Sequence, residues 1–172
     1  MKYYTNSERA YWNIKNNDVN DINENAHDKK FFNNALRTAI LYEDIEMIKA
    51  LSSCYNNINC IYEDGSTSLI VAAYRNRTSE TIQTIIECGA RINTTNCFSW
   101  TALYWAAYNG NQKVCKILIE AGADEKIKND QGFIALGLAK AQRHVDISNT
   151  CSLSEILDIK NTTYYTSNIN LS

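Results

Sequence analysis

The chain contains two stretches that repeat the same residues along their whole length at an interval of about 33 positions. Five residues of the first stretch recur 34 positions later: Thr67, Leu69, Ala72, Ala73 and Tyr74 recur as Thr101, Leu103, Ala106, Ala107 and Tyr108. Five more recur 33 positions later: Ile85, Ile86, Glu87, Gly89 and Ala90 recur as Leu118, Ile119, Glu120, Gly122 and Ala123. The interval shortens because the first stretch holds an additional residue between Arg75 and Glu80. A unit this short cannot bury its own apolar face, so the period predicts a stacked array and favours binding over catalysis.

The second stretch predicts two short helices. Thr101 is well placed to cap the start of a helix over residues 102–108, in which Ala106 and Ala107 allow a neighbouring helix to come close. Gly110 suits the left-handed conformation that ends such a helix. The following apolar residues recur at helical spacing: Val114, Ile117, Leu118 and Ala121. The unit is therefore turn, helix, tight turn, helix and loop, and the chain is predicted to be all-α.

These residues resemble the ankyrin repeat, whose pattern runs D-x-x-G-x-T-P-L-H-x-A-A, then a glycine, an apolar helix and G-A-D-x-N. One copy begins at Asp64, and the copy with Thr101 matches better. A weaker copy begins at Asp130, and another precedes them, with Leu36 and Ala39 in register. The resemblance implies an ankyrin-repeat solenoid of about four repeats, over residues 31–60, 61–94, 95–127 and 128–160, with degenerate terminal units.

The copies depart from the family pattern at two positions. The family's proline and histidine are replaced by Ser68 and Ile70 in one copy, and by Ala102 and Tyr104 in the next. Because that histidine ties neighbouring loops in the family, we expect a less regular array. Asn59 and Asn93 stand at the family's loop asparagine, where we expect them to bind backbone groups of their own turns.

The two ends of the chain show weaker patterns. Residues 1–30 form a polar extension, in which residues 7–15 predict a helix with Ala10, Tyr11 and Ile14 on one side. This helix either docks on the first repeat as an extra cap or stays mobile until a partner orders it. Near the other end we expect a helix over residues 152–159, followed by a tail over 161–172.

Composition excludes several classes of function. A net charge of −2 and a pI near 5.7 argue against a nucleic-acid-binding protein, which normally has a basic face. No apolar run is long enough to cross a membrane, and the polar start after Met1 lacks a signal-peptide core. We therefore predict a cytoplasmic protein, or one delivered into a host cell. The abundance of Asn, Ile, Tyr and Lys without proline is typical of AT-rich genomes.

The six cysteines predict neither a metal site nor a cofactor. They form no C-x-x-C pair, and His27 and His144 lie in no ligand-like spacing to them. No phosphate-binding loop and no hydrolase motif is present. A repeat-scaffold enzyme, the remaining catalytic alternative, would lose its activity on replacement of Cys97 or His144.

The resemblance implies a groove, lined by loop tips and first helices, that holds a protein partner. The matching positions are Glu63, Asp64, Ser66, Tyr74, Arg75, Phe98, Trp100, Tyr108, Asn109, Gln131 and Phe133, with Cys97, Asp130 and Gln142 beside them. Tyr74, Trp100, Tyr108 and Phe133 are expected to form an aromatic strip with a mostly acidic rim that favours a partner rich in Lys or Arg. Alternatively, Trp100 and Phe133 cover apolar surface between repeats. Tyr104 and Trp105 are expected to lie in the core.

We therefore predict a non-catalytic protein-interaction module, monomeric when free. Two biological roles remain open. One is a host-directed bacterial or viral effector, and the other is an immunity-type inhibitor that plugs a cognate toxin enzyme.

Overall fold

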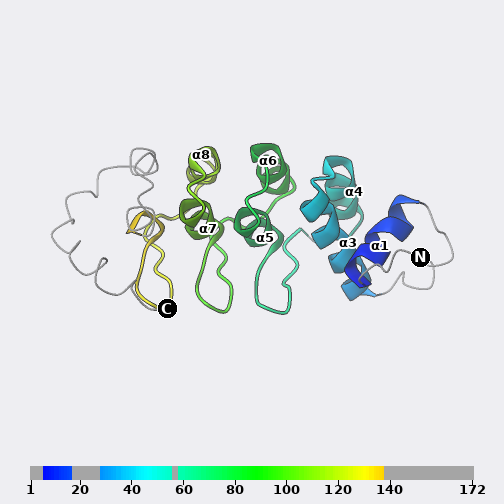
Figure 1. Cartoon of the computed structure of the whole chain (residues 1–172), viewed down its shortest axis with the longest axis horizontal. Helices are drawn as coiled ribbons and strands as arrows, with labels where there is room; N and C mark the ends of the chain where they lie inside the picture. The colour runs from blue at the N-terminus through cyan, green and yellow to red at the C-terminus, as the bar shows by residue number, and fades with distance from the viewer. Residues whose placement is uncertain (1–5, 17–27, 56–57, 138–172) are drawn as a thin grey trace.

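The computed structural model describes residues 6–16, 28–55 and 58–137 (Figure 1). The helices of this part are α1 (Asn6–Lys15), α3 (Lys29–Tyr42), α4 (Ile45–Tyr55), α5 (Ser68–Tyr74), α6 (Ser79–Glu87), α7 (Ala102–Tyr108) and α8 (Gln112–Glu120). Within these ranges the chain forms no β-strand beyond one isolated bridge between Ile61 and Thr67. The described residues therefore form an all-α repeat solenoid, as predicted. The expected helix over residues 152–159, the tail and Gln142 lie outside the described residues, so the predicted unit boundaries stay a prediction.

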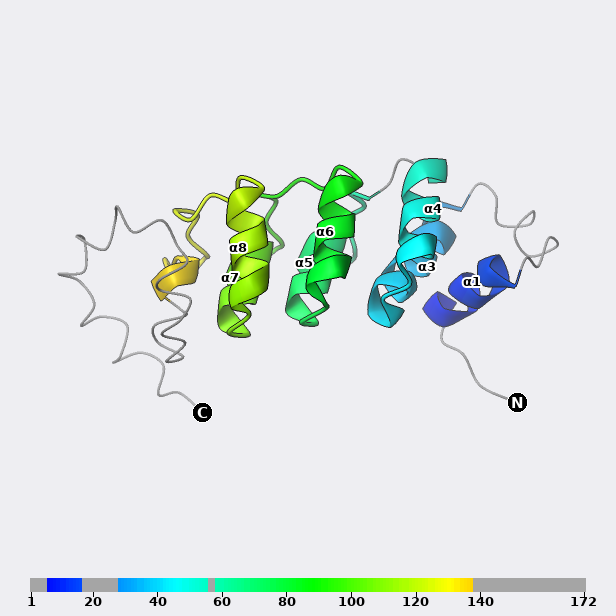
Figure 2. The ribbon, with the colours of Figure 1, turned by 90° about the horizontal axis from the view of Figure 1, so that it is seen from above.

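The helices are arranged as hairpins that stack side by side. Figure 1 shows α4, α6 and α8 in an outer row and α3, α5 and α7 in an inner row, with long loops projecting beyond the inner row. The view from above shows the hairpins following one another along the long axis (Figure 2). Alanine permits this close approach of inner helices, since Ala72, Ala73, Ala106 and Ala107 are all buried between neighbours.

The inner helices begin where threonine caps them. Thr67 Oγ1 accepts a hydrogen bond from the Ile70 amide at 3.4 Å, and Thr101 Oγ1 accepts one from the Tyr104 amide at 3.1 Å. Each bond satisfies an amide that the first turn of a helix leaves without a partner. The predicted cap at Thr101 and the predicted bounds of α7 are confirmed.

The additional residue of the second hairpin is Arg77. The residues in the left-handed conformation after each inner helix are Glu43, Asn76 and Gly110 (φ 57°, 52° and 71°). In the first and third hairpins the next residue caps the outer helix, because Asp44 accepts from Met47 and Asn111 accepts from Val114. In the second hairpin the cap is Thr78, one position later. Arg77 is therefore the insertion that shifts the repeat interval.

Arg77 ties the second hairpin to the first. Its Nη1 donates to the Leu41 carbonyl at 3.1 Å and lies 3.3 Å from a carboxylate oxygen of Glu43. That carboxylate also accepts from the amide of Thr78 and the hydroxyl of Thr81, each at 3.2 Å. Burial on its own would raise the pKa of Glu43, but these hydrogen bonds and the Arg77 charge hold it below its ordinary value.

Asparagines join each hairpin to the next at the residues that follow the outer helices α6 and α8. The expectation that these asparagines bind backbone groups of their own turns is wrong. Each donates its Nδ2 to a carbonyl and accepts at its Oδ1 from an amide about 30 residues further on. Asn59 binds the Gly89 carbonyl and the Arg91 amide, at 3.0 and 2.7 Å. Asn93 binds the Gly122 carbonyl and the Asp124 amide, at 3.0 and 2.8 Å. The asparagine amide carries a donor and an acceptor together, so one side chain spans the gap between hairpins.

The N-terminal helix α1 docks on the first hairpin, which decides between the two alternatives for this segment. Ala10 and Tyr11 are buried against the hairpin, and Ile14 is half-buried. The Tyr11 hydroxyl donates to Asp44 at 2.8 Å, and Lys15 Nζ donates to the same carboxylate oxygen. Burial would raise the pKa of Asp44, but the hydrogen bonds from Lys15 and Tyr11 keep it below its ordinary value. The helix predicted over residues 7–15 is thus present and caps the array.

Candidate functional site

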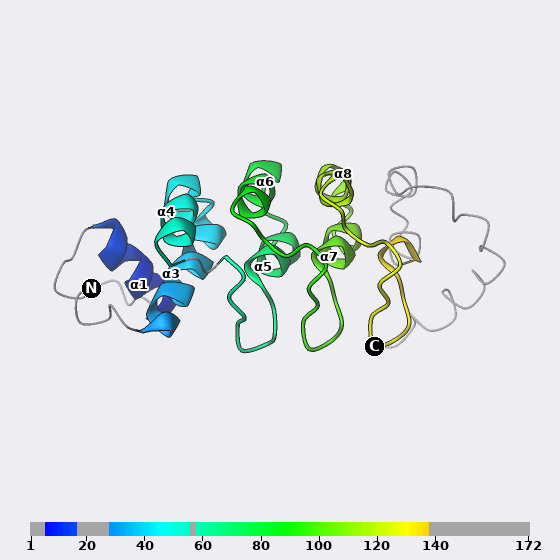
Figure 3. The same ribbon diagram turned by 180° about the vertical axis from the view of Figure 1, so that it is seen from behind.

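Three loops, which precede α5, α7 and the helical residues 135–137, carry most of the predicted site residues (Figure 3). Each is closed by an equivalent backbone bond, namely Tyr62 to Ser66, Asn96 to Trp100 and Asn129 to Phe133, with N–O distances of 2.9, 3.1 and 2.9 Å. Neighbouring loops are also joined, because the Cys97 amide donates to the Asp64 carbonyl and the Asp130 amide to the Phe98 carbonyl, both at 3.4 Å. The three loops therefore form one continuous surface, which we call the loop row.

Two buried asparagines shape the tips of the second and third loops. Asn96 Oδ1 accepts from the amides of Phe98 and Trp100, both at 3.0 Å. Asn129 Oδ1 likewise accepts from the amides of Gln131 and Phe133, at 3.1 and 2.8 Å. Sequence reasoning missed both residues, although their separation of 33 positions was a visible signal.

Tyr104 stands where the ankyrin pattern has a histidine, and its hydroxyl bonds to a residue of the next loop. Asn129 Nδ2 donates to the Tyr104 hydroxyl at 3.1 Å, which connects α7 to the next loop. Burial raises the pKa of Tyr104, and the nearby Asp130 and Tyr108 raise it further, while the bond from Asn129 lowers it. Tyr104 is buried, as expected.

In the first loop an aspartate, rather than an asparagine, accepts the hydrogen bonds that shape the tip. Asp64 accepts from both the amide and the hydroxyl of Ser66, each at 3.0 Å. Ser66 is buried in this arrangement. Its hydroxyl serves the loop in this arrangement, and the predicted part of Ser66 in the partner-binding surface stays a prediction.

The aromatic side chains gather around Trp105. The rings of Tyr74, Trp100 and Tyr108 lie 4.6, 4.6 and 5.6 Å from its ring, centroid to centroid, at interplanar angles of 65°, 87° and 79°. Edge-to-face contacts of this kind are favoured by the ring quadrupoles. Phe98 lies 5.1 Å from Trp100, which also stacks on Tyr104 at 5.5 Å. We call Tyr74, Phe98, Trp100, Tyr104, Trp105 and Tyr108 the aromatic cluster.

Three rings of the aromatic cluster are exposed: Tyr74 by 50%, Phe98 by 47% and Tyr108 by 45%. Trp100 is half-buried, and its indole N–H is buried without an acceptor, because the ring packs on Phe98, Tyr104 and Trp105 of its own unit. Trp105 is also half-buried rather than in the core. Its spacing of three from Tyr108 places both on one helix face, a signal that could have found it. Phe133 is half-buried, and its place in an aromatic strip stays a prediction.

The remaining predicted site residues divide into exposed charges and structural groups. Arg75 places its guanidinium 5.2 Å from the centroid of the Tyr74 ring, and Glu63 pairs with Lys30 at 3.3 Å. Asn109 donates to the carbonyls of Ala73 and Tyr74, at 2.9 and 3.2 Å, and so caps the end of α5. Gln131 and Asp130 are exposed on the third loop.

Cys60 is one of the two buried free cysteines among the described residues. Burial raises the pKa of the Cys60 thiol, which makes it a poor nucleophile. In the described ranges no group of three or more His, Cys, Asp and Glu side chains is placed to hold a metal ion. None of the helices in the described ranges is long and apolar enough to cross a membrane.

The repeat fold agrees with the comparisons to known proteins. The sequence profile of a family described as ankyrin repeats, in three copies, matches residues 69–150. The chain is 33% identical over 108 residues to a probable E3 ubiquitin-protein ligase, XBOS34, of rice, a match that covers 62% of this chain and 21% of the rice protein. It is 33% identical over 84 residues to ankyrin repeat and SAM domain-containing protein 6 of the rat, covering 48% of this chain and 9% of that protein.

Over 84 residues the chain is also 34% identical to the human palmitoyltransferase ZDHHC17, covering 48% of this chain and 13% of the human protein. The chain thus matches about a fifth or less of the length of these relatives. The relatives that are named as enzymes match through their ankyrin regions.

Proposed function

We propose that this chain, whose residues 69–150 match the ankyrin-repeat family, binds a protein partner and has no chemistry of its own. Ankyrin repeats are generally modules for protein–protein interaction. The observation that supports this proposal is the aromatic cluster, in which Tyr74, Phe98 and Tyr108 are about half exposed although they pack together. Clustered apolar rings on a surface mark interaction sites, and Tyr and Trp are enriched among the residues that dominate binding energy.

The proposed surface consists of the aromatic cluster and the loop row. Its predicted contact residues are Glu63, Asp64, Ser66, Tyr74, Arg75, Phe98, Trp100, Tyr108, Asn109, Gln131 and Phe133. The exposed acids Glu63, Asp64 and Asp130 favour a partner with a basic patch, because opposite charges speed association and reject acidic competitors. We propose that the free chain is a monomer and that the partner is not a nucleic acid.

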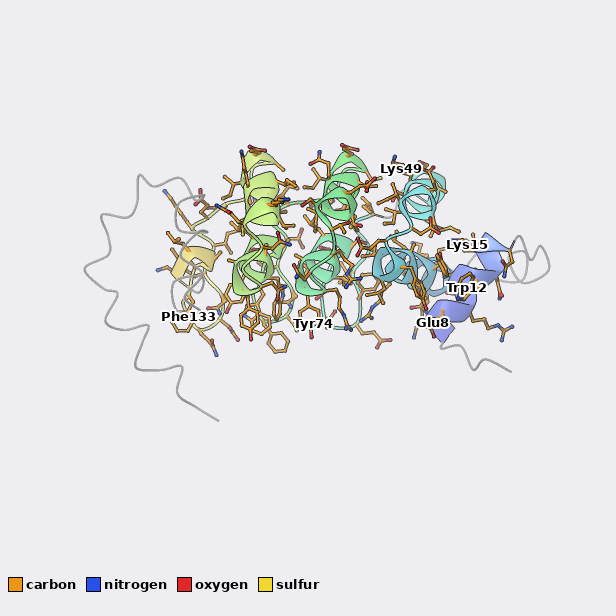
Figure 4. The ribbon with its side chains drawn as sticks, turned by 45° about the horizontal axis from the view of Figure 1, so that its top comes forward. Glu8, Trp12, Lys15, Lys49, Tyr74 and Phe133 are labelled. Carbon is orange, nitrogen blue, oxygen red and sulfur yellow. The ribbon has the colours of Figure 1, made fainter. Side chains whose placement is uncertain are left out.

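The proposal is tested by selecting binders from a displayed peptide library on the purified chain and comparing their affinities for two double variants. Tyr74→Ala/Tyr108→Ala removes two exposed rings, and truncation at a hot spot costs about 2 kcal/mol or more, so the dissociation constant should rise at least roughly thirtyfold. The control Lys49→Ala/Lys116→Ala alters the outer row; Figure 4 shows Lys49 on the side opposite Tyr74. Both variants must keep the helical circular dichroism of the parent. Equal affinity of the parent and the tyrosine variant would rule out this surface.

For the biological role we propose a host-directed modulator that occupies or recruits a eukaryotic protein. The proposal draws on the AT-rich composition and on relatives from rice, rat and human. The alternative is an inhibitor that plugs a cognate toxin enzyme. The two are separated by measuring whether a toxin encoded beside this chain loses its turnover when the chain is added, which only the inhibitor predicts.

A further inference from the structure

The turn between α7 and α8 contains the one Asn-Gly dipeptide of the sequence, Asn109-Gly110. Asparagine before glycine is the arrangement most open to attack by the following backbone nitrogen on the side-chain amide, because glycine has no Cβ to obstruct the approach. The equivalent residues of the second hairpin are Arg75 and Asn76, which cannot react in this way. The dipeptide therefore marks the junction at which α7 packs on α5.

The side-chain amide of Asn109 holds α7 to α5. Its Nδ2 donates to the carbonyls of Ala73 and Tyr74, at 2.9 and 3.2 Å. Both carbonyls belong to the last two residues of α5, at the helix end that has too few amides of its own for its carbonyls. The ring of Tyr74 crosses the same junction, because it lies 4.6 Å from the ring of Trp105 on α7. Asn109 therefore supports the aromatic cluster by joining the two helices that carry the Tyr74 and Trp105 rings.

While the junction is closed, Asn109 is held away from this reaction. Its backbone has φ −77° and ψ −4°, a helical conformation that must rotate before the side chain and the next nitrogen can close a five-membered ring. The Gly110 nitrogen, which is the nucleophile, donates to the Ala107 carbonyl at 3.2 Å. The reaction therefore requires α7 to part from α5, and repeat arrays open locally in this way, because each unit is held only by its neighbours.

We propose that Asn109 is a site of spontaneous deamidation, which proceeds when the α5–α7 junction opens and then keeps it from closing tightly. The Gly110 nitrogen gives up its proton and attacks the Asn109 Cγ. An N–C bond forms, the Cγ–Nδ2 bond breaks, and the amide group leaves with that proton as ammonia. Water then opens the cyclic imide at either of its carbonyls, which leaves aspartate or isoaspartate at this position. The inference rests on the proposed function in one respect, since the surface that the reaction loosens is the proposed partner-binding surface.

The product cannot make the hydrogen bonds of the parent side chain. An asparagine amide donates through its nitrogen, whereas a carboxylate only accepts, so the two α5 carbonyls would face another acceptor. The new negative charge also lies at the C-terminal end of a helix, where the helix dipole disfavours it. Asn111, two residues later, is the contrasting position. Its Oδ1 caps α8 by accepting from the Val114 amide at 3.2 Å, a bond that a carboxylate keeps.

The site is tested by incubating the full chain in neutral buffer at body temperature and following conversion at each asparagine by peptide mapping with mass spectrometry. We expect conversion at Asn109 ahead of the internal control Asn111, which precedes glutamine. A synthetic peptide of residues 102–115 lacks the junction and should convert roughly tenfold or more faster than the folded chain. Tyr74→Ala removes the ring contact between α5 and α7 and should speed conversion roughly threefold or more, whereas Lys49→Ala on the outer helix α4 should not.

Two charge-matched variants test the consequence for the junction. Asn109→Asp should speed hydrogen exchange of the α5 and α7 amides roughly tenfold, whereas Asn111→Asp should leave them unchanged. The parent chain aged by incubation, separated from unreacted chain by its added charge, should exchange like Asn109→Asp. This aged chain gives the same reading if the variant folds poorly.

Four results would overturn the deamidation site: a folded chain that converts at Asn109 no sooner than at Asn111, equal rates in the folded chain and the peptide, equal rates in Tyr74→Ala and Lys49→Ala, or equal exchange in the two aspartate variants. The library binders judge the proposed function separately. If they depend on Tyr74 and Tyr108 yet bind Asn109→Asp as tightly as the parent, the proposed function stands and the link to partner binding fails. If they ignore both tyrosines, the proposed function fails, while conversion and faster exchange still support the deamidation site.

Discussion

At the scale of single residues, the sequence predicts what depends on neighbours in the chain and misses what depends on the stack. The caps at Thr101 and the left-handed Gly110 follow from local rules, and both are confirmed. The asparagines Asn59 and Asn93 were assigned to their own turns because turn chemistry is local, yet their partners lie about 30 residues away. Only the register of one hairpin against the next brings those groups together.

Gly65 and Gly122 both have the left-handed conformation, but only Gly65 lies close to another loop. Substituting each of them therefore distinguishes backbone strain from a clash between loops. Gly65 (φ 75°) lies so near the next loop that a Cβ would be 2.9 Å from the Cys97 nitrogen, whereas nothing lies within 4 Å of a Cβ at Gly122 (φ 92°). We expect Gly122→Ala to lower the free energy of unfolding by about 1–2 kcal/mol through backbone strain alone. Gly65→Ala should cost roughly 1–3 kcal/mol more, because the loops must separate. Urea denaturation measures both, and equal losses would contradict the close packing of the loop row.

At the scale of elements, the helices α5–α8 were predictable because apolar spacing and capping residues agree in each copy. The aromatic cluster was only partly predictable. Tyr74 and Tyr108 were placed correctly on the inner helices, but the rings meet around Trp105, whose half-buried position depends on how α7 packs on α5. The helix α1 was expected from its pattern, while its docking depends on Asp44, which belongs to another element.

Acid should release α1 from the first hairpin. The folded-state pKa of Asp44 lies below its ordinary value of 3.8, so its stabilising contribution is present above that value and is lost as the pH falls through the folded pKa. We expect the Trp12 indole signal, followed by NMR from pH 7 to about pH 2, to move as Tyr11 and Lys15 lose the carboxylate. Asp44→Asn should give the released signal already at neutral pH, and Glu46→Gln, on the exposed side of α4, should not. A Trp12 signal that ignores both acid and Asp44→Asn would refute this role.

At the scale of the whole molecule, stability is carried by junctions between neighbouring hairpins, as in repeat arrays generally. The period of the sequence predicted this architecture directly, since 33 residues are too few for an independent core. The strength of each junction was not predictable, because it depends on individual side chains such as Arg77 that the repeat pattern treats as an insertion.

Arg77→Ala should uncouple the first hairpin from the rest. It removes the bond to the Leu41 carbonyl and the ion pair with Glu43, so the amides of α3 and α4 should exchange hydrogen roughly tenfold faster, while those of α7 and α8 should change little. Arg75→Ala, two positions away on the inner face, is the matched control and should leave α3 and α4 unaffected. Uniform acceleration along the array would show that the junctions do not act separately.

The insertion at Arg77 also gives the array a fixed order. Its guanidinium recognises the carboxylate that follows α3, and neither Asn76 nor Gly110 offers one at the corresponding place. If the second and third hairpins were exchanged, or the second were placed after an unrelated hairpin, the partly buried guanidinium of Arg77 would lose its carboxylate partner. Anyone recombining these modules into longer scaffolds has to move Glu43 and Arg77 as a pair, since each supplies the counterion that the other needs.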